Sequence, residues 1–300
     1  MNRKKSFASL LKITCVMVCS CIGTQFVWAD KTDSESITDT AMGTDCSVRV
    51  YGSDGTAKDI MDMLSDIENK YLSWRIEGSD IANINENASE NEPVMPSKWT
   101  YGYLENVLDL ARESSGAFDP TLGRVSQLWN LESDNPYIPS KSELTELLLE
   151  TGWEKISLGG GEVFLKDSVQ IDLGAVGKGI GCDEARKMLE EADADAAVVS
   201  VGGSILTYGK KPDGKPWKIG IANPRNEDGE SYLGSLTIDG TCSISTSGDY
   251  EKYVIEDGVR YHHILDPKTG YPADSGLISV TIVCEKGWLS DGLSTACFVL

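Results

Sequence analysis

The sequence predicts an α+β fold, with helices in the N-terminal half and a mostly antiparallel β region in the C-terminal half. Before residue 152, apolar residues recur at helical spacing; after it, short runs of β-branched residues alternate with glycine-containing turns. The chain has 300 residues, 40% of them apolar, which is enough for one large domain or two closely packed ones.

The N-terminal half is expected to begin with a strand at residues 41–51, where polar and apolar residues alternate. Apolar residues spaced three or four apart then predict an amphipathic helix over 57–71. The next stretch is rich in turn-forming residues and is expected to form a loop around Trp74. Further helices are expected at 97–114, with Ser97 as the N-cap, at 122–131 and at 141–151.

The C-terminal half is expected to be built mainly from strands. They are predicted at 153–158, 162–167, 169–174, 196–203, 205–208, 217–221, 233–238 and 277–284. Asp257 and Gly258 join two further β-prone runs, a pattern typical of a hairpin. Helices are expected at 182–191, after a glycine-rich turn, and at 288–300, opening near Asp291. The sequence stops on the apolar run ACFVL, after which we expect one more C-terminal element.

The charge balance narrows the possible partners. With 27 basic and 47 acidic residues, the formal net charge is −20. Such a surface repels phosphate backbones, so we expect no nucleic-acid partner. An anionic ligand must be held by local devices, such as a metal, a helix N-terminus or a lysine.

Residues 1–29 have the pattern of a signal peptide, because a basic start is followed by an apolar run and a cleavage site fits before Asp30. Two alternatives stay open: lipid attachment at Cys21 and an uncleaved transmembrane anchor. We expect the protein to work outside the cytoplasm. Residues 30–40 are polar and are expected to form a tether, and residues 41–300 are expected to form the functional domain.

The cysteines do not have the spacing of a metal site. Beyond the leader, five of the eight remain, and they are far apart and contain no CxxC pair. We therefore expect small core residues rather than a disulfide framework. They are Cys46, Cys182, Cys242, Cys284 and Cys297.

Residues 241–272 combine hydroxyl side chains, a hairpin and the only two histidines, His262 and His263. A plain hairpin needs none of the histidines, so this composition indicates a site, although a surface hairpin with a polar turn is the alternative. His262 and His263 point to opposite faces of a strand. We expect His263 to face the site and His262 to tolerate replacement.

Residues 172–179, DLGAVGKG, combine a predicted strand, a glycine-rich turn and a helix start. Backbone N–H groups of such a turn can cradle a diphosphate, to which Lys178 would add a charge. The spacing matches neither the P-loop nor the dinucleotide-binding fingerprint, and the alternative is that the glycines serve steric needs alone.

Asp291 and Thr295 share one face of the last predicted helix. A carboxylate and a hydroxyl so placed suit a hard cation such as Mg²⁺, which also takes phosphate oxygens as ligands. The alternative is that Asp291 is an ordinary N-cap.

Taken together, the motifs resemble those of the FAD:protein FMN transferase family, also called the ApbE family. The matching stretches are AMGT, LSW with SDIANIN, SGAFDPTLG, IDLGAVGKGIGCDEA, VVSVGGSI, WKIGIANP, STSGDYEKY, HHILDPKTGYP and SDGLSTA. They follow one another in the family's order from residue 41 to the last residue. Two departures are His262, where serine is usual, and Gly177, where alanine is commoner.

The resemblance implies a T-fold-like architecture and a Mg²⁺-dependent reaction. FAD is cleaved, FMN becomes attached through a phosphoester to a threonine or serine of an acceptor flavoprotein, and AMP is released. His263 matches the family histidine, whose ordinary pKa suits proton transfer. Carried over by motif, Asp291, Thr295 and the carbonyl of Ala175 would hold the metal. The residues implied to line the FAD are Met42, Trp74, Ala117, Phe118, Asp119, Asp172, Lys178 and Leu265.

Two alternative functions stay open. Water in place of the acceptor hydroxyl would make the protein a metal-dependent FAD pyrophosphatase that yields FMN and AMP. A non-catalytic extracytoplasmic FAD-binding protein is the other alternative, but simple binding would not need Asp291 and Thr295 beside the diphosphate.

Overall fold

The structure, a computed structural model, describes residues 34–131, 133, 135–226, 229 and 231–300. Its centre is a six-stranded antiparallel sheet in the order β1-β2-β5-β6-β9-β12. The strands are β1 (Ser34–Ala41), β2 (Thr44–Tyr51), β5 (Ala196–Val201), β6 (Ser204–Gly209), β9 (Cys242–Gly248) and β12 (Ser279–Cys284). The predicted leader and Cys21 lie outside the described residues.

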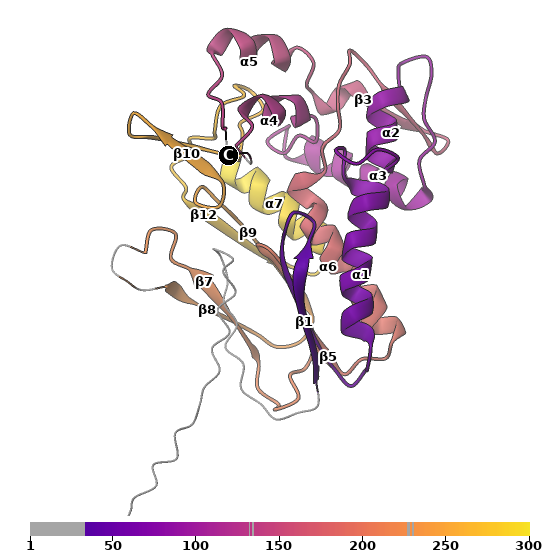
Figure 1. Cartoon of the computed structure of the whole chain (residues 1–300), viewed down its shortest axis with the longest axis vertical. Helices are drawn as coiled ribbons and strands as arrows, with labels where there is room; N and C mark the ends of the chain where they lie inside the picture. Colours follow the sequence, from indigo (N-terminus) through magenta and orange to yellow (C-terminus); the bar gives the residue numbers. More distant parts are fainter. Residues whose placement is uncertain (1–33, 132, 134, 227–228, 230) are drawn as a thin grey trace, which may run out of the picture.

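Helices cover one face of this sheet (Figure 1). They are α1 (Thr56–Ile67), which a π-helical turn (Glu68–Leu72) extends, α6 (Gly174–Glu191) and α7 (Gly287–Val299). A hairpin of β7 (Trp217–Ala222) and β8 (Tyr232–Ile238) packs on the opposite face through Trp217 and Ile219. Every residue of β5 is buried, because this strand is covered on both faces.

A second apolar core lies between α6 and α7 and an outer layer. The outer layer contains α2 (Asp80–Asn87), α3 (Lys98–Glu113), and the hairpin of β3 (Ile156–Gly159) and β4 (Glu162–Leu165), which a short 3₁₀ turn (Trp153–Lys155) precedes. Helices α4 (Gly123–Trp129) and α5 (Lys141–Leu148) enclose a smaller cluster around Trp129. No helix among the described residues is long and apolar enough to span a bilayer.

The predicted α+β class is confirmed, and so is the hairpin at Asp257-Gly258, which joins β10 (Tyr253–Glu256) to β11 (Val259–His262). Both turn residues have positive φ, 50° and 79°, as a tight two-residue turn requires. Ser97 is the N-cap of α3, and its side chain accepts a hydrogen bond from Thr100 N–H, as predicted.

Several elements differ from the prediction. Residues 34–40 belong to β1 rather than to a tether. This edge strand has no apolar pattern in its sequence, and its main-chain pairing with β2 holds it in the sheet. The supposed loop after Trp74 contains α2, which Ser79 caps by accepting from Ala82 N–H. Residues 169–173 form no strand. The glycine-rich segment 174–179 is helical and opens α6, so it is not a turn.

Candidate functional site

The site is built where α6 crosses α7 at very short range. A methyl group added to Gly179 would lie 2.1 Å from the carbonyl oxygen of Gly287, and one added to Gly287 would lie 2.2 Å from that of Gly179. Only glycine permits this approach. Gly179, the last glycine of the 174–179 segment, therefore does serve a steric purpose, which is to let α6 pack directly against α7.

Asp291 lies at this crossing, with a side chain that is almost fully buried. It is not an N-cap, as the sequence allowed, because α7 begins at Gly287 and places Asp291 in its second turn. Its Oδ2 accepts a hydrogen bond of 2.9 Å from Gly179 N–H. Burial raises the pKa of the carboxyl group, and the nearby positive charge of Lys178 opposes that rise.

Hydroxyl groups from the sheet and from α7 form a hydrogen-bonded network next to Asp291, and Ser204 of this network also bonds to its carboxylate. Ser245 on β9 lies 3.0 Å from Ser204 on β6 and 2.8 Å from Ser290 on α7, oxygen to oxygen. Ser247 lies 2.7 Å from the hydroxyl of Ser294 and 3.4 Å from that of Thr295. The hydroxyl-rich segment that begins at Thr241 is thus largely a buried strand, whose polar groups pair with α7.

These donors fit a hard cation. Asp291 supplies a carboxylate, Thr295 a hydroxyl one turn further along α7, and Ala175 a main-chain carbonyl in the first turn of α6. All are oxygen ligands, which Mg²⁺ prefers, and Mg²⁺ commonly keeps waters and takes phosphate oxygens besides one or two carboxylates. The described residues contain no cluster of three or more His, Cys, Asp or Glu side chains suited to a metal.

Lys178 lies in the second turn of α6, and Asp172 lies just before the helix, next to the N-cap residue Leu173. The half-buried Lys178 passes close to the turn between β5 and β6: a methyl group on Gly202 would lie 3.3 Å from its Cδ. Asp172 accepts a hydrogen bond of 2.8 Å from Gly174 N–H, which satisfies one of the first amides of the helix. The helix N-terminus and Lys178 together favour an anion here.

The two histidines have different surroundings. His262 is buried, lies edge-on to Phe298 and contacts the carbonyl oxygen of Ala273 at 3.1 Å through Nε2. These contacts favour a structural role for His262, so we now expect its replacement to destabilise the protein. His263 is half-buried, and its Nδ1 lies 3.3 Å from the carbonyl oxygen of Lys252. Because a carbonyl only accepts, Nδ1 carries the proton and the neutral ring leaves Nε2 as the acceptor.

The electrostatic surroundings keep His263 neutral. Desolvation, and then the positive charges of Lys252 and Lys178, lower its pKa to about 3. Burial also lowers the pKa of His262. At neutral pH, His263 can therefore accept a proton but holds it weakly.

Some residues expected to line the FAD do approach α6 and α7. A methyl group on Gly177 would lie 3.7 Å from Met42 Cε, and one on Gly292 would lie 3.7 Å from the ring of Phe118. Ala117, beside Phe118, is buried. The indole N–H of Trp74 is buried and finds no hydrogen-bond partner among the described residues, which leaves a donor for a ligand.

Asp119 and Leu265 have structural partners. Asp119 accepts hydrogen bonds from Thr121 N–H at 2.9 Å and from Trp153 N–H at 3.2 Å, so its carboxylate fixes the loop after α3. Leu265 is buried in the apolar cluster around Trp129. The side chains of both residues are therefore engaged in contacts within the protein.

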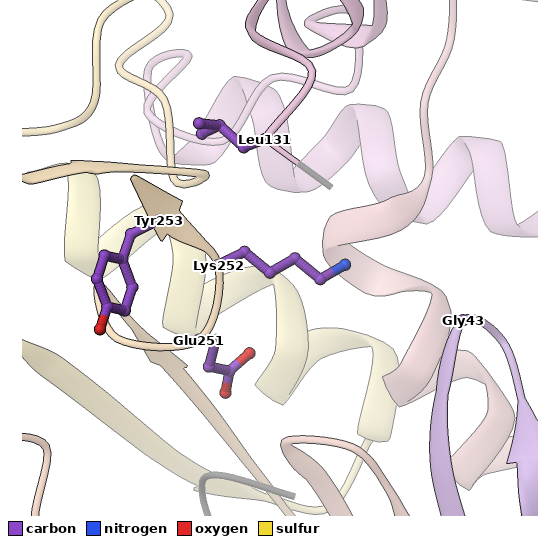
Figure 2. A pocket seen from close by; sticks show the side chains of 5 residues that line it. All are labelled: Gly43, Leu131, Glu251, Lys252 and Tyr253. Carbon is purple, nitrogen blue, oxygen red and sulfur yellow. The ribbon is translucent and has the colours of Figure 1, made fainter. Parts of the chain in front are cut away.

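A cavity of about 400 Å³ opens at the start of the β10–β11 hairpin. Figure 2 shows the side chains that line it. It is lined by Gly43, Leu131, Glu251, Lys252 and Tyr253. Glu251 and Lys252 lie in the link between β9 and β10, and Tyr253 begins β10. The sequence analysis gave none of them a role. The one signal was their place inside the STSGDYEKY stretch, between the hydroxyl run and the histidines.

The fold and the site define a class: an α+β protein in which a buried carboxylate, Asp291, lies close to hydroxyl groups and to the first turns of a helix. The chain belongs to the ApbE family, whose profile matches residues 42–300. It is 34% identical over 281 residues to an FAD:protein FMN transferase of Treponema pallidum, covering 86% of this chain and 76% of that one. A Haemophilus influenzae protein of the same name is 32% identical over 83% of this chain and 73% of its own.

Solved structures agree with the fold. The ApbE protein of Thermotoga maritima superposes with a TM-score of 0.81 at 35% identity, covering 89% of this chain and 87% of that one. The flavin transferase ApbE of Vibrio cholerae gives a TM-score of 0.79 at 28% identity, with coverage of 90% and 87%.

Proposed function

We propose that this protein is a Mg²⁺-dependent FAD:protein FMN transferase. It cleaves the diphosphate of FAD and attaches FMN through a phosphoester to a threonine or serine of an acceptor flavoprotein. The observation that carries the proposal is the buried Asp291 at the α6–α7 crossing, beside Lys178 and the helix N-terminus. A chain of net charge −20 needs such a local device to hold a diphosphate.

The residues would divide the work as follows. The first turns of α6 and Lys178 bind and orient the diphosphate, and Trp74 and Met42 contact the flavin part of FAD. Asp291, Thr295 and the Ala175 carbonyl hold Mg²⁺, which when bound neutralises charge on the phosphates.

His263 would take the proton of the acceptor hydroxyl. The hydroxyl oxygen forms a bond to the FMN phosphorus, the P–O bond to the AMP phosphate breaks, and AMP leaves with the bridging oxygen. The proton passes to Nε2 of His263, which the bond from Nδ1–H to the Lys252 carbonyl orients. A neutral ring is the required starting state.

The site of action is part of the proposal. A cleaved signal peptide or lipid attachment at Cys21 would place the enzyme outside the cytoplasm, with exported flavoproteins as acceptors. Mass analysis of the mature N-terminus would distinguish cleavage before Asp30 from lipidation at Cys21.

The test is mass analysis of a flavoprotein acceptor incubated with the enzyme, FAD and Mg²⁺. We expect the mass of FMN to be added at a threonine or serine, and chelation of Mg²⁺ or Asp291→Ala to abolish the addition. FMN and AMP produced equally fast without an acceptor would establish the pyrophosphatase instead. FAD binding without any cleavage would establish a binding protein. Wild-type transfer by Asp291→Ala would disprove the metal site.

A further inference from the structure

The turn between β5 and β6, residues Gly202 to Ser204, brings three charged side chains to one place. Lys178 lies over Gly202, as described above. A methyl group on Gly203 would lie 3.2 Å from Oε1 of Glu251. The hydroxyl of Ser204 donates a hydrogen bond to Asp291, which helps to keep that carboxylate ionised. Consecutive residues of one turn therefore adjoin Lys178, Glu251 and Asp291.

Glycine is required at this turn. Gly202 has a φ of 53°, and a methyl group there would lie 2.7 Å from the hydroxyl of Thr44. At Gly203 a methyl group would lie 2.9 Å from the carbonyl oxygen of Thr246. The VVSVGGSI stretch thus keeps the space above the turn open for the charged side chains.

Glu251 has a buried carboxylate oxygen, Oε1, that lacks a hydrogen-bond donor among the described residues. Burial and the negative charge of Asp291 both act to raise the pKa of Glu251, and Lys178 and Lys252 act to lower it. Buried carboxylate oxygens normally have a donor, so Oε1 is suited to accept one from a ligand.

We propose that Glu251 is a second carboxylate of the cation site, where its Oε1 accepts a hydrogen bond from a water ligand of the cation, across the Gly202–Ser204 turn from Asp291. This inference rests on the proposed function, which places Mg²⁺ at Asp291. Mg²⁺ keeps several of its waters in protein sites, so a carboxylate beyond direct reach can still act on it. Groups that hold the ligands of a metal in this way commonly change its affinity by about 10–100-fold.

The alternative is that Glu251 serves only as a counter-charge to Lys178. Both roles need a negative charge, but only contact with a water ligand needs the full length of the glutamate side chain. Glu251→Asp keeps the charge and withdraws the carboxylate by one methylene, whereas Glu251→Gln keeps the length and removes the charge. The pair therefore separates the two roles.

The experiment is a titration of the full-length protein with Mn²⁺, with free Mn²⁺ followed by electron paramagnetic resonance. We expect Glu251→Gln and Glu251→Asp each to weaken Mn²⁺ binding by about 10–100-fold. Glu256→Gln is the matched control, because Glu256 is exposed on β10, and it should bind within about twofold of wild type. Melting temperatures identify any variant that fails to fold. A folded Glu251→Asp decides by itself between the two roles, because it keeps the charge and shortens the side chain.

Each outcome decides the question. If Glu251→Asp or Glu251→Gln binds Mn²⁺ as tightly as wild type, the water contact is disproved. If wild type does not bind Mn²⁺, or if Asp291→Asn binds Mn²⁺ as tightly as wild type, the metal site of the proposed function is disproved as well. If Asp291→Asn loses Mn²⁺ binding but the Glu251 variants keep it, only the role of Glu251 is disproved.

Discussion

The α6–α7 crossing and the β10–β11 hairpin are built in opposite ways. At the crossing, main chains touch through Gly179 and Gly287, and Asp291 is buried. The hairpin projects from the body of the molecule (Figure 1), with Tyr253 42% exposed and Ile255 57% exposed. The crossing has no space for a larger side chain at either glycine, whereas the hairpin faces largely solvent.

Under the proposed function, the two regions would serve different parts of the reaction. Groups that must hold a diphosphate at a fixed place lie on rigid, mutually packed helices. The hairpin presents side chains at the mouth of the cavity, where a large acceptor would approach. At the end of β11, His262 is buried against Phe298 of α7, whereas the next residue, His263, is half-buried.

The largest expected effect separates the two histidines. His263→Ala should slow transfer by about 10²–10⁴-fold, the usual loss of a general base, with FAD affinity and melting temperature nearly unchanged. His262→Ala should instead cost about 2–4 kcal/mol of unfolding free energy, because it empties a buried position and leaves the Ala273 carbonyl unpaired. Single-turnover rates and urea denaturation measure both. A folded and fully active His263→Ala enzyme would remove His263 from the mechanism.

The crossing itself can be broken by one methyl group. Gly179→Ala should destabilise the protein by about 1–3 kcal/mol or more, because the new Cβ would overlap the carbonyl of Gly287. Gly102→Ala is the matched control: Gly102 lies in α3 with nothing within 4 Å of an added Cβ, so stability should rise by about 0.5–1 kcal/mol. Ile255→Ser on the hairpin should stay within about 0.5 kcal/mol of wild type.

Lys178 tests whether the start of α6 acts on the diphosphate. Lys178→Ala should weaken FAD binding or slow transfer by about 10–100-fold, as the loss of one charge-assisted contact does. Lys252→Ala, at the mouth of the cavity, is the comparison and should have the smaller effect. Equal kinetics for Lys178→Ala and wild type would mean that the start of α6 serves packing alone.

The smallest expected effect is on the pH dependence of stability. The pKa of His263 is lowered to about 3 in the folded chain, so between that value and its ordinary value the unfolded chain binds more protons. Stability therefore falls as the pH falls through this window, by at most about 1.4 kcal/mol per pH unit for one proton. His263→Gln should lose less stability than wild type between pH 7 and pH 5 in urea titrations. An identical loss would mean that His263 is not held neutral.

Local signals explain what the sequence predicted well. Asp257-Gly258 specifies its turn by backbone preference alone, and Ser97 caps α3 through its own side chain. The order of the motifs was sufficient to recognise the family. Asp291 and Thr295 were predicted on one helical face because that spacing is local.

The failures come from contacts between distant segments. The glycines of residues 174–179 resemble a turn by propensity, and only the approach of Gly287 shows why they are helical. β1 has no apolar pattern because it is an edge strand that β2 pairs on one side. Glu251 could not be placed, since its surroundings depend on the turn at Gly203 and on Asp291.

The bond between Gly179 and Asp291 also has a consequence for the order in which the protein becomes active. The two residues are 112 positions apart in sequence. During synthesis, the start of α6 is made long before α7, and contacts of such separation form slowly because the intervening chain must first be closed into a loop. The sheet can begin to assemble from β1, β2, β5 and β6 while the proposed metal site still lacks Asp291. A nascent or partly folded chain is therefore expected to be inert toward FAD until α7 docks.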